Sequence, residues 1–88
     1  MFIRDLIWDD ENLEHIAAHG VESDEVEDVC FGNNRIERAG KGKHGVLGRT
    51  SEGRLLFIVV AHRGHGLFRV ITARDMNTSE QRRYVRLK

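Results

Sequence analysis

The amino-acid sequence predicts an α+β fold in which two N-terminal helices precede a four-stranded, mainly antiparallel sheet and a C-terminal helix. Three observations support this prediction. Apolar residues recur at helical spacing in the first 30 residues, short extended runs punctuated by glycine follow, and a helix-capping pattern opens the C-terminal segment. The chain has 88 residues, and a second core would leave each half too small to fold without disulfides or metal. Residues 1–88 are therefore expected to form one domain.

Two helices are expected in the first third of the chain. Asp9 is the expected N-cap of the first, because acidic residues and then apolar residues at helical spacing follow it. Gly20 supplies the usual helix stop. Ser23 is expected to cap the second helix in the same way, and that helix should end near Gly32.

Four strands are expected next, over residues 35–39, 46–50, 55–62 and 67–73. The last three are separated by loops short enough for hairpins, so they should form an antiparallel meander. The segment 55–61 is apolar at every position, which suits a central strand covered on both faces.

The C-terminal helix is expected to open with two overlapping capping boxes. Asn77 pairs with Glu80 in the first, and Thr78 pairs with Gln81 in the second. The helix should then run through Tyr84 toward the end of the chain.

Charge is sorted along the sequence. The first 30 residues hold ten Asp and Glu against one basic residue, a net charge of −9, and residues 31–88 hold thirteen Lys and Arg against four acidic residues, a net charge of +9. Such an asymmetry points to a charged partner. An anionic polymer such as RNA, or an acidic protein surface, would bind the basic part, and the acidic helices are expected to face away from it.

Composition argues against several classes of protein. The single cysteine, Cys30, cannot form an internal disulfide, so a reducing cytoplasm is the expected location. No basic-then-apolar leader opens the chain, and the longest apolar run is far short of the roughly 20 residues that span a bilayer. A membrane partner is therefore not expected.

Two histidine pairs raise the question of a metal site. His15 and His19 lie four residues apart in the first predicted helix, and His62 and His65 form an H-x-x-H pair on a predicted hairpin. Each pair supplies two ligands without a clear third. Neither a metal nor another cofactor is therefore expected.

Several short motifs follow one another along nearly the whole chain. They are Trp8-Asp9, Asn12, His19-Gly20, the segment 46–50, Gly53-Arg54, the segment 69–74, and Glu80, Arg83 and Tyr84. In this order and spacing they resemble the BrnT ribonuclease toxins of bacterial and archaeal type II toxin-antitoxin pairs. The resemblance implies a RelE-like fold and metal-independent cleavage of mRNA. It also implies a ribbon-helix-helix antitoxin (BrnA-like) as partner, with DNA bound only through that antitoxin.

Cleavage of RNA without metal needs a base for the 2′-hydroxyl proton, cations for the transition state and an acid for the leaving oxygen. Arg69 and Arg74 are the candidate cations, and His62 is the candidate proton carrier. Tyr84 is an alternative acid or a stacking platform, unless its ring packs the last helix onto the sheet. Strict alternation places Arg69 and Arg74 on opposite faces, so a bulge near Thr72 or an early strand end is needed to bring them together.

Further arginines are expected to bind RNA: Arg49, Arg54, Arg63, Arg82 and Arg83. The alternative is a solvated surface with structural ion pairs to Asp75 or Glu80. An alternative function follows, namely a catalytically inactive module that binds a ribbon-helix-helix antitoxin and takes part in transcriptional autoregulation. The acidic run 22–28 is either a solvated helix face or a docking surface for a basic partner segment.

Overall fold

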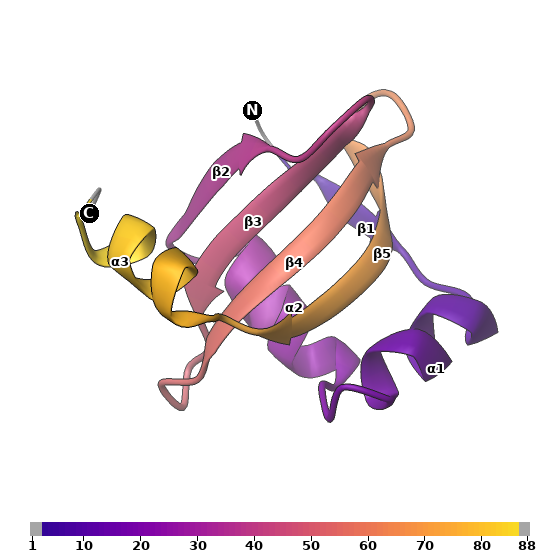
Figure 1. Cartoon of the computed structure of the whole chain (residues 1–88). Helices are drawn as coiled ribbons and strands as arrows, with labels where there is room; N and C mark the ends of the chain where they lie inside the picture. The colour runs from indigo at the N-terminus through magenta and orange to yellow at the C-terminus, as the bar shows by residue number, and fades with distance from the viewer. Residues whose placement is uncertain (1–2, 87–88) are drawn as a thin grey trace.

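A computed structural model describes residues 3–86, which form three helices and five strands (Figure 1). In chain order they are β1 (Asp5–Ile7), α1 (Asp10–Ala17), α2 (Ser23–Cys30), β2 (Asn34–Arg38), β3 (Lys43–Arg49), β4 (Leu55–His62), β5 (Leu67–Asp75) and α3 (Thr78–Arg86). The strands make one mixed sheet in the order β1-β5-β4-β3-β2. In Figure 1 helix α2 lies behind the sheet and α1 lies at the lower right, beside β5. Helix α3 lies at the left and packs against the other face of the sheet.

The predicted α+β class and the helix order are confirmed, but the predicted four-stranded sheet is wrong by one strand. The additional strand is β1, which pairs in parallel with β5, whereas all other neighbours are antiparallel. Three residues are too few to display an alternating pattern. The strand forms because Leu6 is buried opposite Phe68 and because the edge of β5 offers backbone partners.

The two N-terminal helices begin close to the predicted positions. Asp9 is the N-cap of α1, and it forms a reciprocal pair with Asn12 in which each side chain accepts from the other backbone N–H at 2.9 Å. The second cap differs by one residue, because Ser23 is the first helical residue and Glu22 precedes it. The backbone N–H of Glu22 donates to the carboxylate of Glu25 at 3.1 Å.

The antiparallel meander of β3, β4 and β5 is confirmed. The prediction that β4 is covered on both faces is wrong. Its residues Leu56, Ile58 and Val60 are fully buried beneath α1 and α2, but Phe57 and Val59 on the other face are only partly buried. The continuous apolar run therefore marks a strand with one covered face and one apolar face that is only partly covered.

Two apolar clusters lie on opposite sides of the sheet. The larger cluster fills the space between the sheet and α1 and α2. There α2 packs closely on β3, because a Cβ placed on Gly48 would lie only 2.8 Å from Cγ1 of Val29. The smaller cluster joins Leu47, Met76 and Tyr84 under α3. Helix α3 thus covers one corner of the second face and leaves the rest uncovered.

The start of α3 follows the first of the two predicted capping boxes. The N–H of Glu80 donates to Asn77 at 2.8 Å, and the N–H of Asn77 donates to Glu80 at 2.9 Å. In place of the second box, the side chain of Gln81 donates to the carbonyl of Met76 at 3.2 Å. The expected continuation of the helix to the chain end falls outside the described residues. Between residues 3 and 86, no helix is long and apolar enough to cross a membrane.

Candidate functional site

A β-bulge in β5 sets the geometry of the site. Consecutive residues of β4 pair with Thr72 and with Val70, so Ile71 is an extra residue in β5. Buried residues precede and follow this point at positions that strict alternation would place on opposite faces. The bulge therefore places Arg69 and Arg74 on the same face of the sheet, which confirms the hypothesis of a bulge near Thr72.

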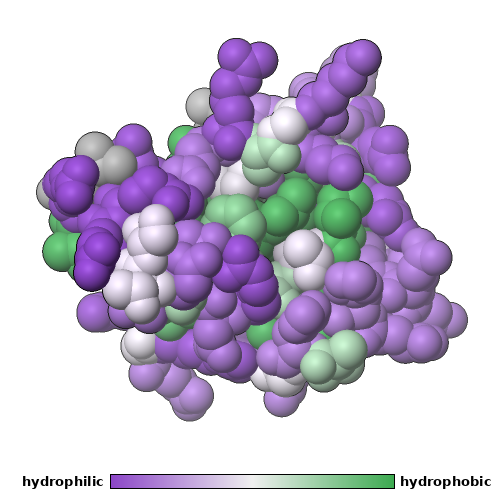
Figure 2. All heavy atoms as spheres, viewed as in Figure 1, coloured by the Kyte–Doolittle hydropathy of each residue, from purple (hydrophilic) through white to green (hydrophobic). Residues whose placement is uncertain are grey.

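That face, which lies away from α1 and α2, is called the open face below. Figure 2 shows it with a hydrophobic patch at its centre and hydrophilic side chains around the patch. Its central residues by strand register are Val59 and Ala61 of β4, both partly buried. Lys43 lies directly opposite Ala61 on the neighbouring strand. The open face thus combines an apolar floor with a charged rim.

Arg74 of β5 is held on the open face by hydrogen bonds and by a ring contact. Its Nη1 and Nη2 each donate to one carboxylate oxygen of Glu80 at 2.8 Å, and Nη1 also donates to the carbonyl of Asp75 at 3.1 Å. Its Cζ lies 4.8 Å from the centroid of the Phe57 ring, within the range of a cation–π contact. The bonds to Glu80 raise the pKa of Arg74.

One edge of the Arg74 guanidinium carries no partner within residues 3–86. Three of its five N–H groups are used by Glu80 and Asp75, and the remaining two, on Nε and Nη2, share one edge. Such an edge matches two oxygens of a phosphate. The side chain of Arg74 is 37% exposed, so an anion has access to it.

Glu80 holds Arg74 as a carboxylate. Burial would raise its pKa, but the hydrogen bonds from Arg74 and from the N–H of Asn77, together with nearby positive charge, lower the pKa overall. Glu80 is therefore ionised at neutral pH, with its oxygens committed to Arg74 and to the start of α3.

Arg83 lies on the same side of the sheet, on α3. It donates through Nε and Nη2 to the carboxylate of Glu37 at 3.3 and 2.8 Å, and through Nη1 to Ser79 at 3.2 Å. The bonds to Glu37 raise the pKa of Arg83. Two arginine–glutamate pairs thus anchor α3 beside the open face.

Arg69 is neutralised by the N-terminus of α1. Nε and Nη2 both donate to Asp9, at 3.2 and 3.1 Å, and Nη2 also donates to Glu11 at 3.0 Å. The expectation that the acidic helices face away from the basic sheet is therefore wrong here. Ile7 of β1 pairs with Arg69, and α1 begins only three residues later, so its first carboxylates reach this arginine.

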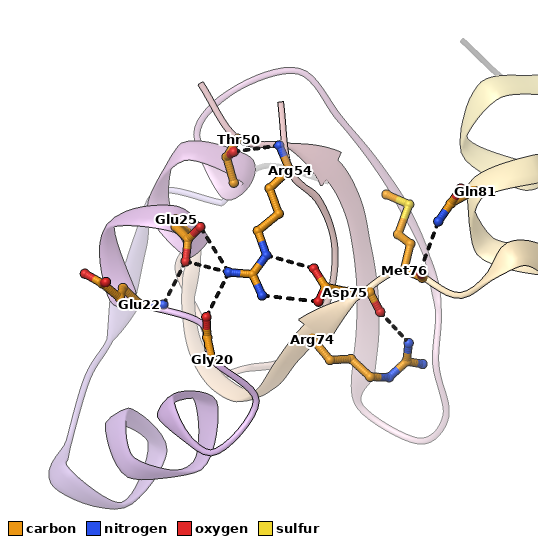
Figure 3. A network of polar contacts seen from close by, with 9 residues as sticks. All are labelled: Gly20, Glu22, Glu25, Thr50, Arg54, Arg74, Asp75, Met76 and Gln81. Atoms are coloured by element: carbon orange, nitrogen blue, oxygen red, sulfur yellow. Dashed lines mark hydrogen bonds and ion pairs between the residues drawn. The ribbon is translucent and has the colours of Figure 1, made fainter. Parts of the chain in front are cut away.

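Arg54 lies on the helix-covered side rather than on the open face (Figure 3). It binds the carboxylate of Asp75 at 2.7 and 3.2 Å, the carboxylate of Glu25 at 3.0 and 3.2 Å, and the carbonyl of Gly20 at 2.8 Å. These bonds, chiefly those to Asp75, raise the pKa of Arg54 and lower that of Asp75. In this geometry Arg54 connects α2 to the end of β5, and its RNA contact stays a prediction.

The other predicted RNA-binding residues lie apart from this network. Arg49, Arg63 and Arg82 are exposed, and none takes part in an ion pair within residues 3–86. Arg49 ends β3, Arg63 lies in the loop after β4, and Arg82 lies on α3. They remain available to a polyanion, and their RNA contacts stay a prediction.

The predicted proton carriers are not brought together with the arginines. His62 projects from the same face of β4 as the buried residues of that strand, with its ring 4.8 Å from that of Phe68, so the sheet separates it from Arg74. Tyr84 is buried and packs against Leu47 beneath α3. In this geometry the ring of Tyr84 packs α3 onto the sheet. The catalytic roles of His62 and Tyr84 stay predictions.

Metal and thiol chemistry have little support in the described residues. No group of three or more His, Cys, Asp or Glu side chains is placed to hold a metal within residues 3–86. The rings of His15 and His19 lie 5.7 Å apart without a third ligand. Burial raises the pKa of the Cys30 thiol to about 12, so it is not a nucleophile at neutral pH.

Sequence reasoning missed Phe57 and Glu37 as neighbours of the candidate arginines. Phe57 contacts Arg74 because the two residues are direct cross-strand partners, and Glu37 reaches Arg83 from 46 positions away. Both contacts depend on strand register, which no local pattern supplies. Only Glu80 carried a signal, through its capping box with Asn77.

A family model described as the ribonuclease toxin, BrnT, of type II toxin-antitoxin systems matches residues 8–80. The chain belongs to the BrnT family. The match includes Arg69, Arg74 and Glu80 and ends before Arg83 and Tyr84. The predicted resemblance to BrnT is thereby confirmed.

The BrnT fold is also found among solved structures. The crystal structure of the Brucella abortus ribonuclease toxin, BrnT, superimposes with a TM-score of 0.69 at 18% sequence identity, covering 84% of this chain and 97% of that one. At this identity the likeness establishes the fold. The comparison with curated proteins gave no significant match.

Proposed function

We propose that this protein is the toxin of a type II toxin-antitoxin pair, and that it cleaves mRNA by metal-independent transesterification on its open face. Membership of the BrnT family supports the ribonuclease activity. The single observation that supports the location is the Nε–Nη2 edge of Arg74, which has no partner among residues 3–86, while Glu80 holds the Nη1–Nη2 end of the group.

In the proposed reaction the 2′-oxygen of a ribose attacks the adjacent phosphorus while a base removes its proton. The bond to the 5′-oxygen breaks, that oxygen takes a proton, and a 2′,3′-cyclic phosphate remains. Arg74 binds two phosphate oxygens, whose negative charge grows in the transition state. Because the guanidinium is already oriented, no reorganisation is needed as the charge develops.

Several unpaired cations near the site favour a polyanionic substrate. Arg35 and Lys43 belong to the open face by strand register, and Arg49 ends the neighbouring strand. Within residues 3–86 none of them forms an ion pair with a carboxylate. RNA that lies along β3 would meet these cations on its way to Arg74.

The titratable side chains beside the candidate arginines are carboxylates rather than histidines. The carboxylates of Glu37 and Glu80 lie beside the candidate arginines, whereas none of the five histidines projects from the open face by strand register or lies beside Arg74. A role for His62 would require RNA to pass around the sheet edge. A role for Tyr84 would require the phenol to be reached from beneath α3.

A cytoplasmic single-domain toxin with a ribbon-helix-helix (BrnA-like) antitoxin remains the proposed context. One observation favours the alternative of a catalytically inactive binding module. Arg54, Arg69 and Arg83 each use the Nε–Nη2 edge of the guanidinium to bind a carboxylate, so this edge is not available to a phosphate. Arg74 distinguishes the two functions, because it alone of these four keeps the Nε–Nη2 edge free of partners within residues 3–86.

The test is cleavage of labelled RNA by purified protein in EDTA. Arg74→Ala is expected to lower kcat about 10²–10³-fold, and Arg74→Lys to restore little of it, because an ammonium cannot provide two donors on one edge. Arg38→Ala serves as the matched arginine control, because Arg38 is exposed and by strand register belongs to the helix-covered side of the sheet. An Arg74→Ala protein that is folded and cleaves RNA at the wild-type rate would contradict the proposed site.

A further inference from the structure

We infer that Phe57 is a positioning residue, whose ring fixes the plane of the Arg74 guanidinium and thereby directs its free edge toward the substrate phosphate. The assignment of that edge to an RNA phosphate rests on the proposed function. The orientation of Arg74 by Phe57 rests on geometry alone.

The register of the sheet creates the contact. Phe57 of β4 is the direct cross-strand partner of Arg74 of β5, and this pairing exists only because the bulge has already shifted the register. The Arg74 Cζ lies 4.8 Å from the ring centroid. A guanidinium at this distance is attracted to the face of an aromatic ring, and side chains of opposed residues are close enough to hold the geometry.

Gly45 of β3 provides the space for the ring. A Cβ on residue 45 would lie 2.8 Å from Cε1 and 3.1 Å from Cζ of Phe57. Gly45 does not have a positive φ, so its backbone conformation does not require glycine. The absence of a side chain lets the ring of Phe57 lie against β3, where it meets Arg74 on the neighbouring strand.

The remaining contacts act within the guanidinium plane. Glu80 holds the end formed by Nη1 and Nη2, and the carbonyl of Asp75 holds Nη1. These bonds fix the positions of Nη1 and Nη2, but they restrain less strongly a tilt of the guanidinium plane about the line that joins these two atoms. The ring of Phe57 restricts that tilt, because tilting the guanidinium would lose the contact with the ring face.

A double-mutant comparison separates a positioning role of Phe57 from a purely structural one. If Phe57 acts through Arg74, substituting Phe57 should lower kcat only while Arg74 is present. Phe57→Leu keeps an apolar side chain on the strand and is expected to lower kcat for RNA cleavage about tenfold or more with little change in KM. In an Arg74→Ala background the same substitution should cost nothing further, because no guanidinium is left to position. Phe57→Tyr, which keeps the ring face, should restore the wild-type rate.

The control is Phe31→Leu, the same substitution at an exposed phenylalanine that follows α2 on the helix-covered side of the sheet. It should leave kcat unchanged. Gly45→Ala should reproduce the Phe57→Leu defect by displacing the ring. Equal losses from Phe57→Leu in the wild-type and Arg74→Ala backgrounds, or no loss in either, would overturn the proposed positioning.

A measurement without catalysis separates this inference from the proposed function. In ¹⁵N-labelled protein, the Nε–H resonance of Arg74 should be sharp and distinct in the wild type and should broaden or move to the position of mobile arginines in Phe57→Leu. An unchanged resonance overturns the positioning role. A protein that fails to cleave RNA, but in which this resonance depends on Phe57, overturns the proposed function and leaves the orientation of Arg74 intact.

Discussion

Arg74 and Glu80 are joined by two parallel hydrogen bonds of 2.8 Å, and the same carboxylate accepts the N–H of Asn77 at the start of α3. The end of β5, the first turn of α3 and the candidate phosphate-binding group therefore depend on one carboxylate. Its protonation would loosen all three at once.

Acid should destabilise the protein through this carboxylate. Because the folded-state pKa of Glu80 is lowered from the ordinary value of 4.5, its contribution to the free energy of unfolding is complete above that value and is lost as the pH falls through the folded-state pKa. The pKa values of Asp9, Asp28 and Asp75 are also lowered and act in the same direction. Urea midpoints should fall from about pH 5 downward.

Glu80→Gln isolates the contribution of this residue to the acid response. The variant should be less stable than the wild type at pH 7, and the difference should shrink as the pH falls. A constant difference from pH 7 to pH 3 would contradict the lowered pKa.

Arg54→Ala should destabilise the fold rather than disturb the open face directly. The substitution removes bonds to Asp75, Glu25 and the Gly20 carbonyl, from a side chain that is 29% exposed. We expect a loss of about 1–3 kcal/mol in the free energy of unfolding, measured by chemical denaturation. Arg63→Ala, an exposed arginine in a loop, should change it by less than about 0.5 kcal/mol. Equal effects of the two substitutions would show that the Arg54 network is not stabilising.

Gly48→Ala should test the close packing of α2 on β3. The added Cβ would lie 2.8 Å from Cγ1 of Val29 and 3.2 Å from the carbonyl oxygen of Asn33, so the helix has to move. We expect a cost of about 1–3 kcal/mol in the free energy of unfolding. The cost should be smaller in a Val29→Ala background, where the methyl group that clashes is gone.

Glu11→Gln should increase RNA affinity. The substitution removes one of the two carboxylates on Arg69 while preserving the shape of the side chain. The slope of log affinity against log salt should steepen by up to about one unit, as expected for one additional phosphate contact. Glu14→Gln, on the same helix and without an ion pair in the described part of the chain, is the matched control. Equal gains from both substitutions would indicate a general charge effect rather than release of Arg69.

Features that depend on neighbouring residues could be predicted from the sequence. The caps at Asp9 and Asn77 follow from the side chains within one helical turn, and the meander follows from two short loops. If Arg69 and Arg74 belong to one site, their odd separation predicts either a bulge near Thr72 or an early strand end, and the structure has the bulge. Local chemistry fully specifies none of the contacts that cross the sheet.

Features that depend on distant residues could not be predicted. The strand β1 exists only through its partner β5, about 60 positions later. The same parallel pairing brings Asp9 to Arg69, which turned a predicted cation into one side of an ion pair. The charge asymmetry along the chain shows that one part is acidic and the other basic, but it does not predict which acidic residue pairs with which arginine.

Asp75 contacts an arginine on each side of the sheet. Its carboxylate binds Arg54, which is held by α2, and its backbone carbonyl binds Arg74 on the open face. A shift of α2, caused by a ligand or a substitution, would therefore reach Arg74, the candidate phosphate-binding residue, through Asp75 alone. The helix-covered side and the open face are thus connected through the side chain and the backbone carbonyl of the same residue.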